Sequence, residues 1–192
     1  MVRCIDFANK KELRTVDWYT QLYAHAVCAE YYPEFDVWYN SKIVGHIGLD
    51  RVLICATINA SDNDRVTLFR NALPSLGSAK IVVGIAILKN TLAEKKICTL
   101  RVNEAFRGKG IGSCLIEQAF EELETDKPLM TVPEETLGQF GNLLRRYDFR
   151  CNEESVGMYR HGFAEYLFNL EYQLCCYDES CTDIKTKDLL LV

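Results

Sequence analysis

A glycine-rich turn between a strand-like and a helix-like segment constrains this 192-residue chain more than any other feature. Residues 96–102 alternate between two sets of side chains, which predicts a β-strand with Ile97 and Leu100 on opposite faces. Residues 111–123 carry apolar side chains at intervals of three and four, which predicts an amphipathic helix. The turn between them reads Arg107-Gly108-Lys109-Gly110-Ile111-Gly112. The sequence therefore predicts a strand, a tight turn and a helix in direct succession.

This turn is suited to holding a phosphate group against the backbone. Glycines lack a Cβ atom, so the main chain can approach an anion closely and adopt positive φ angles. The first turn of a helix leaves N–H groups that can point at phosphate oxygens, and the helix dipole favours negative charge there. Arg107 and Lys109 add positive charge at the same place. The alternative is a connection that needs glycine only for its turn, and the spacing alone does not decide between the two.

The turn resembles the acyl-CoA loop of the GNAT superfamily of N-acetyltransferases. In that family the pattern Arg/Gln-x-x-Gly-x-Gly/Ala follows a strand and opens a helix, and Arg107, Gly110 and Gly112 fit it directly. The flanks are also similar to the family, and the resemblance covers residues 80–170. Its parts are the third strand at 81–88, the fourth strand and its exit at 100–106, the fifth strand at 129–132, a helix at 134–146 and the entry to the last strands at 147–149.

Two other nucleotide-binding motifs do not fit the turn. A dinucleotide fingerprint needs Gly-x-Gly-x-x-Gly, whereas Gly108, Gly110 and Gly112 are each two residues apart. A P-loop needs four residues between its first glycine and a Gly-Lys-Ser/Thr ending, and no such string occurs. The turn therefore suits coenzyme A better than NAD or ATP.

The resemblance implies an α/β (α+β) protein with the GNAT fold, in which helices flank a mixed central sheet of six to seven strands. We expect an N-terminal extension of helix and strand at residues 1–50, packed on the core. The acetyltransferase domain then occupies residues 51–170, and residues 171–192 form a C-terminal tail.

The N-terminal part of the chain allows two placements of its elements. The patterns predict helices at 16–30 and 66–73 and short strands at 35–39, 42–47 and 51–58. In the first placement, the strand at 52–61 and the helix at 66–73 are the first strand and helix of the family. In the second, the helix at 16–30 is the first helix, the strands at 35–39 and 42–47 follow it, and residues 51–78 are an insertion. The sequence leaves both open.

The cofactor that the resemblance implies is acetyl-CoA. The turn would hold its pyrophosphate, and the strand before the turn would orient its acyl arm, with backbone N–H groups polarising the carbonyl. The implied coenzyme-binding residues are Leu100, Arg101, Val102, Arg107, Gly108, Lys109, Gly110, Ile111, Gly112 and Ser113.

The chain departs from the family at its usual acid and base. Many members have a tyrosine that acts as the general acid, five residues before a phenylalanine. This chain has Leu144 at the tyrosine position, and it has Asp148 where those members have a glycine. Tyr147 is the predicted substitute, with Tyr159 as an alternative. Some members use a glutamate near the start of the fourth strand as base. Lys96 stands at that position, so the predicted base is Glu94, two residues earlier and on the same strand face.

The predicted function is enzymatic: transfer of an acetyl or short acyl group from acyl-CoA to a primary amine, by direct attack in a ternary complex. The acceptor is a small molecule or a protein, and a homodimer is one assembly that the sequence leaves open. Two alternatives stay open as well. The missing tyrosine motivates a non-catalytic CoA-binding module that acts through a protein partner, and Arg145, Arg146 and Arg150 motivate an acetyltransferase toxin that acts on aminoacyl-tRNA.

Composition bears on the partners and on the cellular compartment. The formal net charge of -5 speaks against a general nucleic-acid binder. Apolar runs are shorter than a membrane span and residues 1–11 lack a signal-peptide core, so we expect a cytoplasmic protein. The nine cysteines are scattered and include no C-x-x-C pair. We therefore expect no metal site, and reduced thiols on apolar faces at Cys98 and Cys114.

Overall fold

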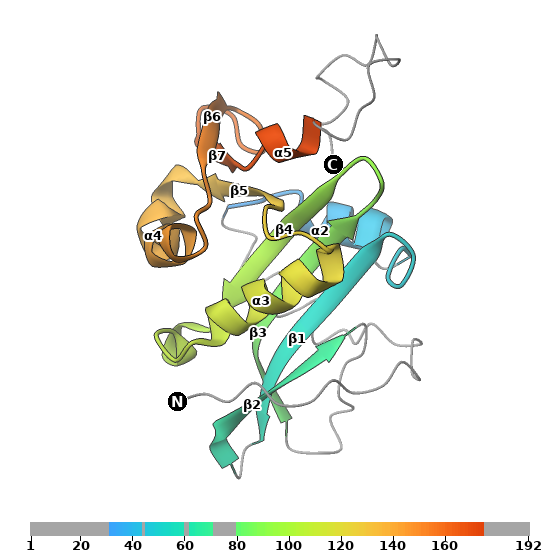
Figure 1. The fold of residues 1–192 in the computed structure, drawn as a ribbon, viewed down its shortest axis with the longest axis vertical. Helices are drawn as coiled ribbons and strands as arrows, with labels where there is room; N and C mark the ends of the chain where they lie inside the picture. Colours follow the sequence, from blue (N-terminus) through green and yellow to red (C-terminus); the bar gives the residue numbers. More distant parts are fainter. Residues whose placement is uncertain (1–30, 44, 60–61, 71–79, 175–192) are drawn as a thin grey trace.

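The computed structural model describes residues 31–43, 45–59, 62–70 and 80–174. Its centre is a seven-stranded sheet in the order β2-β1-β3-β4-β5-β7-β6 (Figure 1). Neighbouring strands are antiparallel except β4 and β5, which are parallel. The strands are β1 (Arg51–Asn59), β2 (Asp62–Arg70), β3 (Lys80–Asn90), β4 (Lys95–Val102), β5 (Leu129–Pro133), β6 (Cys151–Val156) and β7 (Ala164–Phe168). This mixed sheet flanked by helices confirms the predicted fold class.

Helices cover both faces of the sheet. α3 (Ile111–Leu123) contacts β3, β4 and β1, and α4 (Leu137–Arg146) follows a 3-10 turn at Glu134–Thr136. The opposite face carries α2 (Phe35–Trp38) and a π-helical turn at Tyr39–Ile43, so that α2 lies behind the sheet and α3 in front of it in Figure 1. A 3-10 turn at Glu104–Phe106 follows β4, and α5 (Glu171–Leu174) follows β7.

Two glycines allow α3 to approach its neighbours closely. A Cβ atom at Gly84 of β3 would lie 3.1 Å from both the Arg101 carbonyl oxygen and the Leu115 side chain. A Cβ atom at Gly112 would lie 3.1 Å from Leu143 of α4. Both distances are tighter than ordinary packing, so small residues at these positions fix the depth at which α3 sits.

A bulge changes the predicted faces of β4. The register against β3 shifts between the pairs Ile87↔Thr99 and Leu88↔Ile97, which leaves Cys98 as the extra residue. Ile97 and Leu100 consequently lie in the same core beneath α3, although strict alternation puts them on opposite faces. Cys98 and Thr99 are both directed to the other side of the sheet, where they line a cavity.

Three predicted elements of the N-terminal part are wrong. Residues 66–73 are not a helix, because residues 62–70 form β2 and pair with β1, with Val66 and Leu68 buried two residues apart. Residues 35–39 and 42–47 are not strands. Phe35, Tyr39 and Ile43 recur every four residues and are all buried against the sheet, which is the period of a helix. The first placement is therefore wrong in its helix but not in its strand, which is β1, and the second placement is wrong in its two strands at 35–39 and 42–47.

The predicted helix at 16–30 and the tail from residue 175 onwards lie outside the described residues, and the three-part division of the chain stays a prediction. Among the described cysteines, Cys98 is free as expected, whereas Cys114 is disulfide-bonded, so the expected reduced thiol is wrong there. The helices in the described part are all too short or too polar to cross a membrane.

Candidate active site

The glycine-rich turn forms one wall of a cleft of about 320 Å³ between the start of α3 and the side of α4. We call it the glycine-loop cleft. Its other wall comes from the end of β4 and from Gln139, Phe140, Asn142 and Leu143 of α4. The structure brings together nine of the ten predicted coenzyme-binding residues here, namely Leu100, Arg101, Val102, Arg107, Gly108, Gly110, Ile111, Gly112 and Ser113.

The backbone of the turn has the conformation that its glycines permit. Gly108 and Gly110 have φ angles of 74° and 84°, in the left-handed region, and a Cβ atom at either would meet nothing within 4 Å. Gly110 is the N-cap of α3, and its carbonyl accepts the first helical bond from the Cys114 N–H at 3.1 Å. No side chain caps this helix end. The N–H groups of its first turn therefore face the cleft as available donors.

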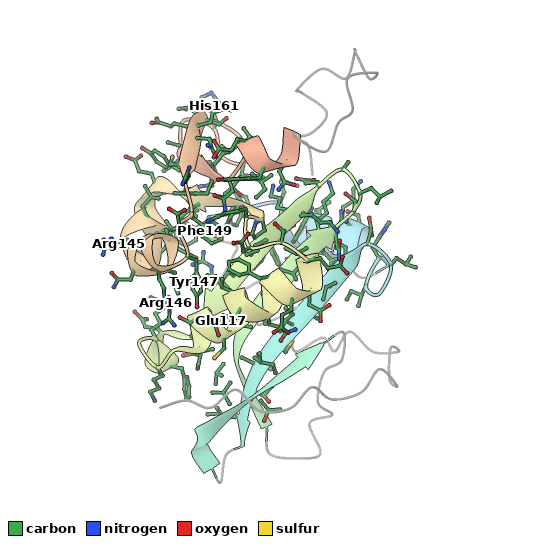
Figure 2. The ribbon with its side chains drawn as sticks, viewed as in Figure 1. Glu117, Arg145, Arg146, Tyr147, Phe149 and His161 are labelled. Atoms are coloured by element: carbon green, nitrogen blue, oxygen red, sulfur yellow. The ribbon has the colours of Figure 1, made fainter. Side chains whose placement is uncertain are left out.

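Positive charge at the cleft comes from few side chains. Arg107 is exposed, and its Nε donates to the Val102 carbonyl at 3.3 Å, which holds its stem along the rim. Lys109 does not line the cleft and instead lies over the Phe106 ring, 5.0 Å from its centre. Arg145 lies on the side of α4 away from α3, and Arg146 approaches Glu117 at 3.8 Å (Figure 2). The expected concentration of cations therefore narrows to Arg107, because the Arg101 guanidinium lies over the Tyr31 ring, 4.8 Å from its centre, on the face of the sheet that carries α2.

A second, narrow cavity of about 30 Å³ opens where β4 and β5 separate. In the described strands, these two pair only at Lys96↔Leu129 and Ile97↔Met130, so the later part of β4 diverges from β5. Thr99 and Leu100 on one side and Thr131 and Pro133 on the other line this gap cavity. Leu100, Arg101 and Phe140 belong both to it and to the glycine-loop cleft.

A third cavity, of about 350 Å³, lies on the opposite face of the sheet, under α2. We call it the aromatic cavity, because Tyr32, Phe35, Trp38 and Tyr159 form much of its lining. It shares Tyr32, Cys98, Thr99 and Thr131 with the gap cavity. The glycine-loop cleft, the gap cavity and the aromatic cavity thus lie in a row that passes through the sheet between β4 and β5.

Two buried charged residues, Lys96 and Glu165, lie on the face of the sheet that carries the aromatic cavity. Lys96 lines it and donates from Nζ to the Tyr159 hydroxyl at 3.4 Å. Glu165 of β7 is on the same face of the sheet, since its neighbours Tyr166 and Phe168 belong to the core beneath α3. Within the described residues, neither carboxylate oxygen of Glu165 has a hydrogen-bond partner. Burial raises the pKa of Glu165 to about 7, although Arg160 acts to lower it.

Glu94 and Tyr147, the predicted base and acid, are not among the lining residues of these three cavities. Glu94 is buried in the turn between β3 and β4, where its carboxylate pairs with Lys89. Tyr147 lies between α4 and α3, and its hydroxyl donates to Glu117 at 2.7 Å (Figure 2). Burial raises the pKa of Tyr147. Leu144 packs in the core beneath α3. The catalytic roles of Glu94 and Tyr147 stay predictions.

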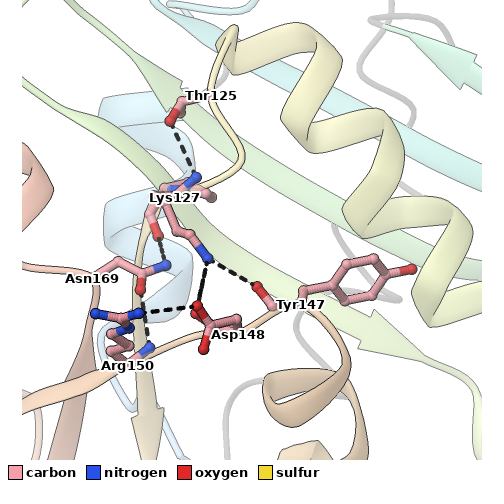
Figure 3. Close-up of polar contacts among 7 residues, drawn as sticks. Thr125, Lys127, Tyr147, Asp148, Arg150 and Asn169 are labelled. Atoms are coloured by element: carbon pink, nitrogen blue, oxygen red, sulfur yellow. Dashed lines mark hydrogen bonds and ion pairs between the residues drawn. The ribbon is translucent and has the colours of Figure 1, made fainter.

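The turn after α4 holds Asp148 in the left-handed conformation, with φ of 50°. Glycine adopts this conformation readily, which is a physical reason for the glycine at this position in the family pattern. Lys127 donates from Nζ to the Asp148 carbonyl at 3.0 Å and pairs with its carboxylate at 3.3 Å (Figure 3). Asn169 fixes the same region, because its side chain accepts from the Arg150 N–H and donates to the Pro128 carbonyl. These contacts tie the end of α4 to β5 and β7.

Lys96 and Glu165 are the site residues that sequence patterns missed as a pair. In the sequence, Lys96 is notable only because it stands where some family members have a glutamate, and no motif or spacing distinguishes Glu165. A charged residue between apolar neighbours in a short strand, as in Ala164–Phe168, is the one sign that could have marked Glu165.

Comparisons with known proteins agree with this architecture. No family model and no curated protein sequence matches the chain. Among solved structures, NAA60 from Arabidopsis thaliana, in complex with a bisubstrate analogue, superposes with a TM-score of 0.52 and 19% identity, over 81% of this chain and 95% of that one. The chain has the GNAT fold. At this identity the likeness shows the GNAT fold alone.

Two further structures with weaker similarity are a protein from Desulfovibrio desulfuricans assigned to the GNAT family of acetyltransferases and Ard1 from Thermoplasma volcanium. Their identities are 13% and 19%, and their TM-scores are 0.40 and 0.37. The matches cover 53% and 45% of this chain. The chain spans 65% and 62% of these two proteins, slightly less than two thirds of their length.

Proposed function

We propose that this protein is an N-acetyltransferase that transfers an acetyl or short acyl group from acyl-CoA to a primary amine, by direct attack in a ternary complex. The observation that carries the proposal is the row of three cavities. The glycine-loop cleft and the aromatic cavity lie on opposite sides of the gap between β4 and β5 and share lining residues with the gap cavity. Two reactants that enter from the two sides would meet at the gap.

The glycine-loop cleft fits the diphosphate of coenzyme A. Gly108 and Gly110 leave open space where other residues would place a Cβ atom, and the uncapped first turn of α3 presents N–H donors to the same space. Arg107 would add charge, and the diverging part of β4, which includes the main chain of Arg101, would hold the pantetheine arm with its main-chain groups. Acetyl-CoA supplies an acetyl group activated as a thioester. The A. thaliana NAA60 structure, with its bisubstrate analogue, supports a two-substrate site in this fold.

Positioning is the main contribution that these residues can make to the rate. Main-chain N–H groups of residues 100–102 that β5 leaves unpaired are suited to polarise a carbonyl at the gap. Orienting two reactants in one site can lower a barrier by about 7 kcal/mol or more, whereas an acid or base adds about 10² to 10⁴ in rate. Glu94 and Tyr147 remain the proposed base and acid, and removing either would slow the reaction without abolishing it.

Release of free thiol from acetyl-CoA tests the function. The full chain should bind acetyl-CoA in calorimetry and release thiol when an acceptor amine from a panel of small amines and peptides is added. Binding without thiol release from any amine, peptide or charged tRNA would favour the non-catalytic module. Thiol release with charged tRNA alone would favour the toxin, and no binding of acetyl-CoA would overturn the proposal.

A further inference from the structure

Lys96 places a cationic side chain in the wall of the aromatic cavity. The residue lies in β4 and is only 7% exposed. Lysine is almost never buried to this extent without a charged partner, because an ammonium loses its hydration on burial. The partners of Lys96 therefore matter for what the cavity can hold.

No carboxylate pairs with Lys96 among the described residues. Its hydrogen bond is the long one to the Tyr159 hydroxyl, at 3.4 Å. The nearby carboxylate of Glu94 is engaged by Lys89. Burial acts to lower the pKa of Lys96, but Tyr159, Cys98 and Glu94 outweigh it and the pKa is raised, so the ammonium stays charged. A three-donor cation is thus left with one weak acceptor.

The rest of the cavity is suited to an apolar group. Phe35, Trp38 and Met158 line it together with Lys96, and its volume of about 350 Å³ is within the usual range for small-molecule sites. The polar residues Glu34, Ser41 and Lys42 also line it but are exposed, so Lys96 is the buried cation of the cavity. Thr99 and Thr131 line both this cavity and the gap cavity, so they lie at the end of the aromatic cavity that adjoins the gap. Lys96 lies three residues before Thr99, a separation of at most about 10 Å along the strand, because the bulge at Cys98 shortens it.

We propose that the aromatic cavity selects a primary amine whose apolar body carries a carboxylate at the end remote from the amine, and that Lys96 binds this carboxylate. The proposal rests on the proposed function, because it names the class of acceptor that this site takes. An amine directed to the gap and a carboxylate directed to Lys96 are then separated by the apolar body between Phe35 and Trp38. An α-amino acid, with both groups on one carbon, does not have this separation.

A matched pair of amines tests the proposal with the native chain. 4-(Aminomethyl)benzoate carries the carboxylate, and 4-methylbenzylamine has a methyl group in its place. Calorimetry on the full chain loaded with coenzyme A should show tighter binding of the carboxylate compound by about ten-fold, the effect of one charge-assisted hydrogen bond in a partly buried site. Equal affinities, or tighter binding of the methyl compound, would overturn the proposal without the need for any variant.

Lys96→Met then assigns the preference to one side chain. Methionine keeps most of the length of the lysine side chain and removes its charge, so this variant should lose the ten-fold preference. Lys95→Met is the control. Lys95 directly precedes Lys96 in β4, but its Nζ pairs with Asn90 and it does not line the cavity. A preference that survives Lys96→Met, or that Lys95→Met also removes, contradicts the proposal. Circular dichroism confirms that both variants are folded.

Binding and turnover separate this proposal from the proposed function. If 4-(aminomethyl)benzoate binds through Lys96 but releases no thiol from acetyl-CoA, the anion site stands and the transfer reaction fails. If thiol is released equally from both amines, with equal affinities, the transfer reaction stands and the role of Lys96 fails.

Discussion

Single residues determine whether the glycine-loop cleft can accept a diphosphate, and Gly110 is the most sensitive of them. Its φ of 84° is strained for a residue with a side chain, and worst for a β-branched one. We expect Gly110→Val to weaken acetyl-CoA binding by about ten-fold or more and to cost on the order of 1–2 kcal/mol of stability. Calorimetry and urea unfolding measure the two effects.

The control for this prediction is Gly138→Ala in α4. A Cβ atom at Gly138 meets nothing within 4 Å, and the residue does not line the cleft. The Gly138→Ala variant should therefore bind acetyl-CoA with the same affinity as the wild type. Unchanged affinity in Gly110→Val as well would mean that the coenzyme binds elsewhere.

Glu165 gives the protein a specific dependence of stability on pH. Its pKa is raised from 4.5 to about 7, first by burial. Below pH 4.5 the carboxyl is neutral in both the folded and the unfolded chain, and its contribution to stability is fully present. As the pH rises to 7, the unfolded chain releases the proton and the folded chain retains it, so the free energy of unfolding falls.

We expect Glu165→Gln to remove this fall. Between pH 4.5 and pH 8, the wild-type chain should lose on the order of 2 kcal/mol more stability than the variant, measured by urea unfolding. Glu153→Gln, at an exposed position of β6, should behave like the wild type. Parallel pH profiles for the wild type and Glu165→Gln would show that Glu165 ionises normally in the folded chain.

The local motif was enough to predict most of the cleft, and it could not predict the far side of the sheet. The residues from Arg107 to Ser113 are consecutive, so their spacing alone brings them together at a helix start. Lys96 and Glu165 come together only through the order of β4, β5 and β7, which one sequence does not reveal. The bulge at Cys98 adds to the difficulty, since it reverses which residues of β4 face the aromatic cavity.

At the scale of elements, the turn after α4 and the end of β7 hold the C-terminal strands in place through Asn169. This residue is buried with φ of 61°, and it bonds to Arg150 at 3.0 Å and to Pro128 at 3.2 Å. We expect Asn169→Ala to cost about 3 kcal/mol, because two buried bonds are lost and alanine disfavours the left-handed backbone.

Asn169→Gly separates the two causes. Glycine accepts the left-handed backbone but makes no side-chain bond, so it should cost about 1 kcal/mol less than alanine. Urea unfolding of the two variants measures the difference. Equal costs would show that the backbone conformation is without influence.

Elements with a strong period were predictable, and short aromatic segments were not. β1, β3, β4, α3, β5 and α4 appear where the patterns placed them. Phe35, Tyr39 and Ile43 were misread because aromatic residues favour strands, whereas burial against β1 and β3 selected a helical turn. Residues 66–73 were predicted as a helix because the polar residues 61–64 before them look like a cap, although pairing of β2 with β1 decides the conformation.

At the scale of the whole molecule, the two helical layers give the two sides of the sheet different chemistry. The face under α3 and α4 offers backbone donors and the Arg107 side chain to a diphosphate. The face under α2 offers aromatic side chains, with the buried cation Lys96 in the wall of the aromatic cavity. The separation of β4 from β5 is the connection between the two, so the proposed reaction depends on the gap more than on any acid or base.

Thr131→Phe tests that dependence. Thr131 lines both the gap cavity and the aromatic cavity, and a phenyl ring would fill a space of only about 30 Å³. Thiol release should fall by about a hundred-fold, because the amine can no longer reach the thioester, while binding of coenzyme A, whose diphosphate lies in the glycine-loop cleft away from Thr131, should change much less. Thr131→Val keeps the size of threonine without its hydroxyl and should retain turnover. If Thr131→Phe turns over like the wild type, or if Thr131→Val is equally inactive, the reactants do not meet through this gap.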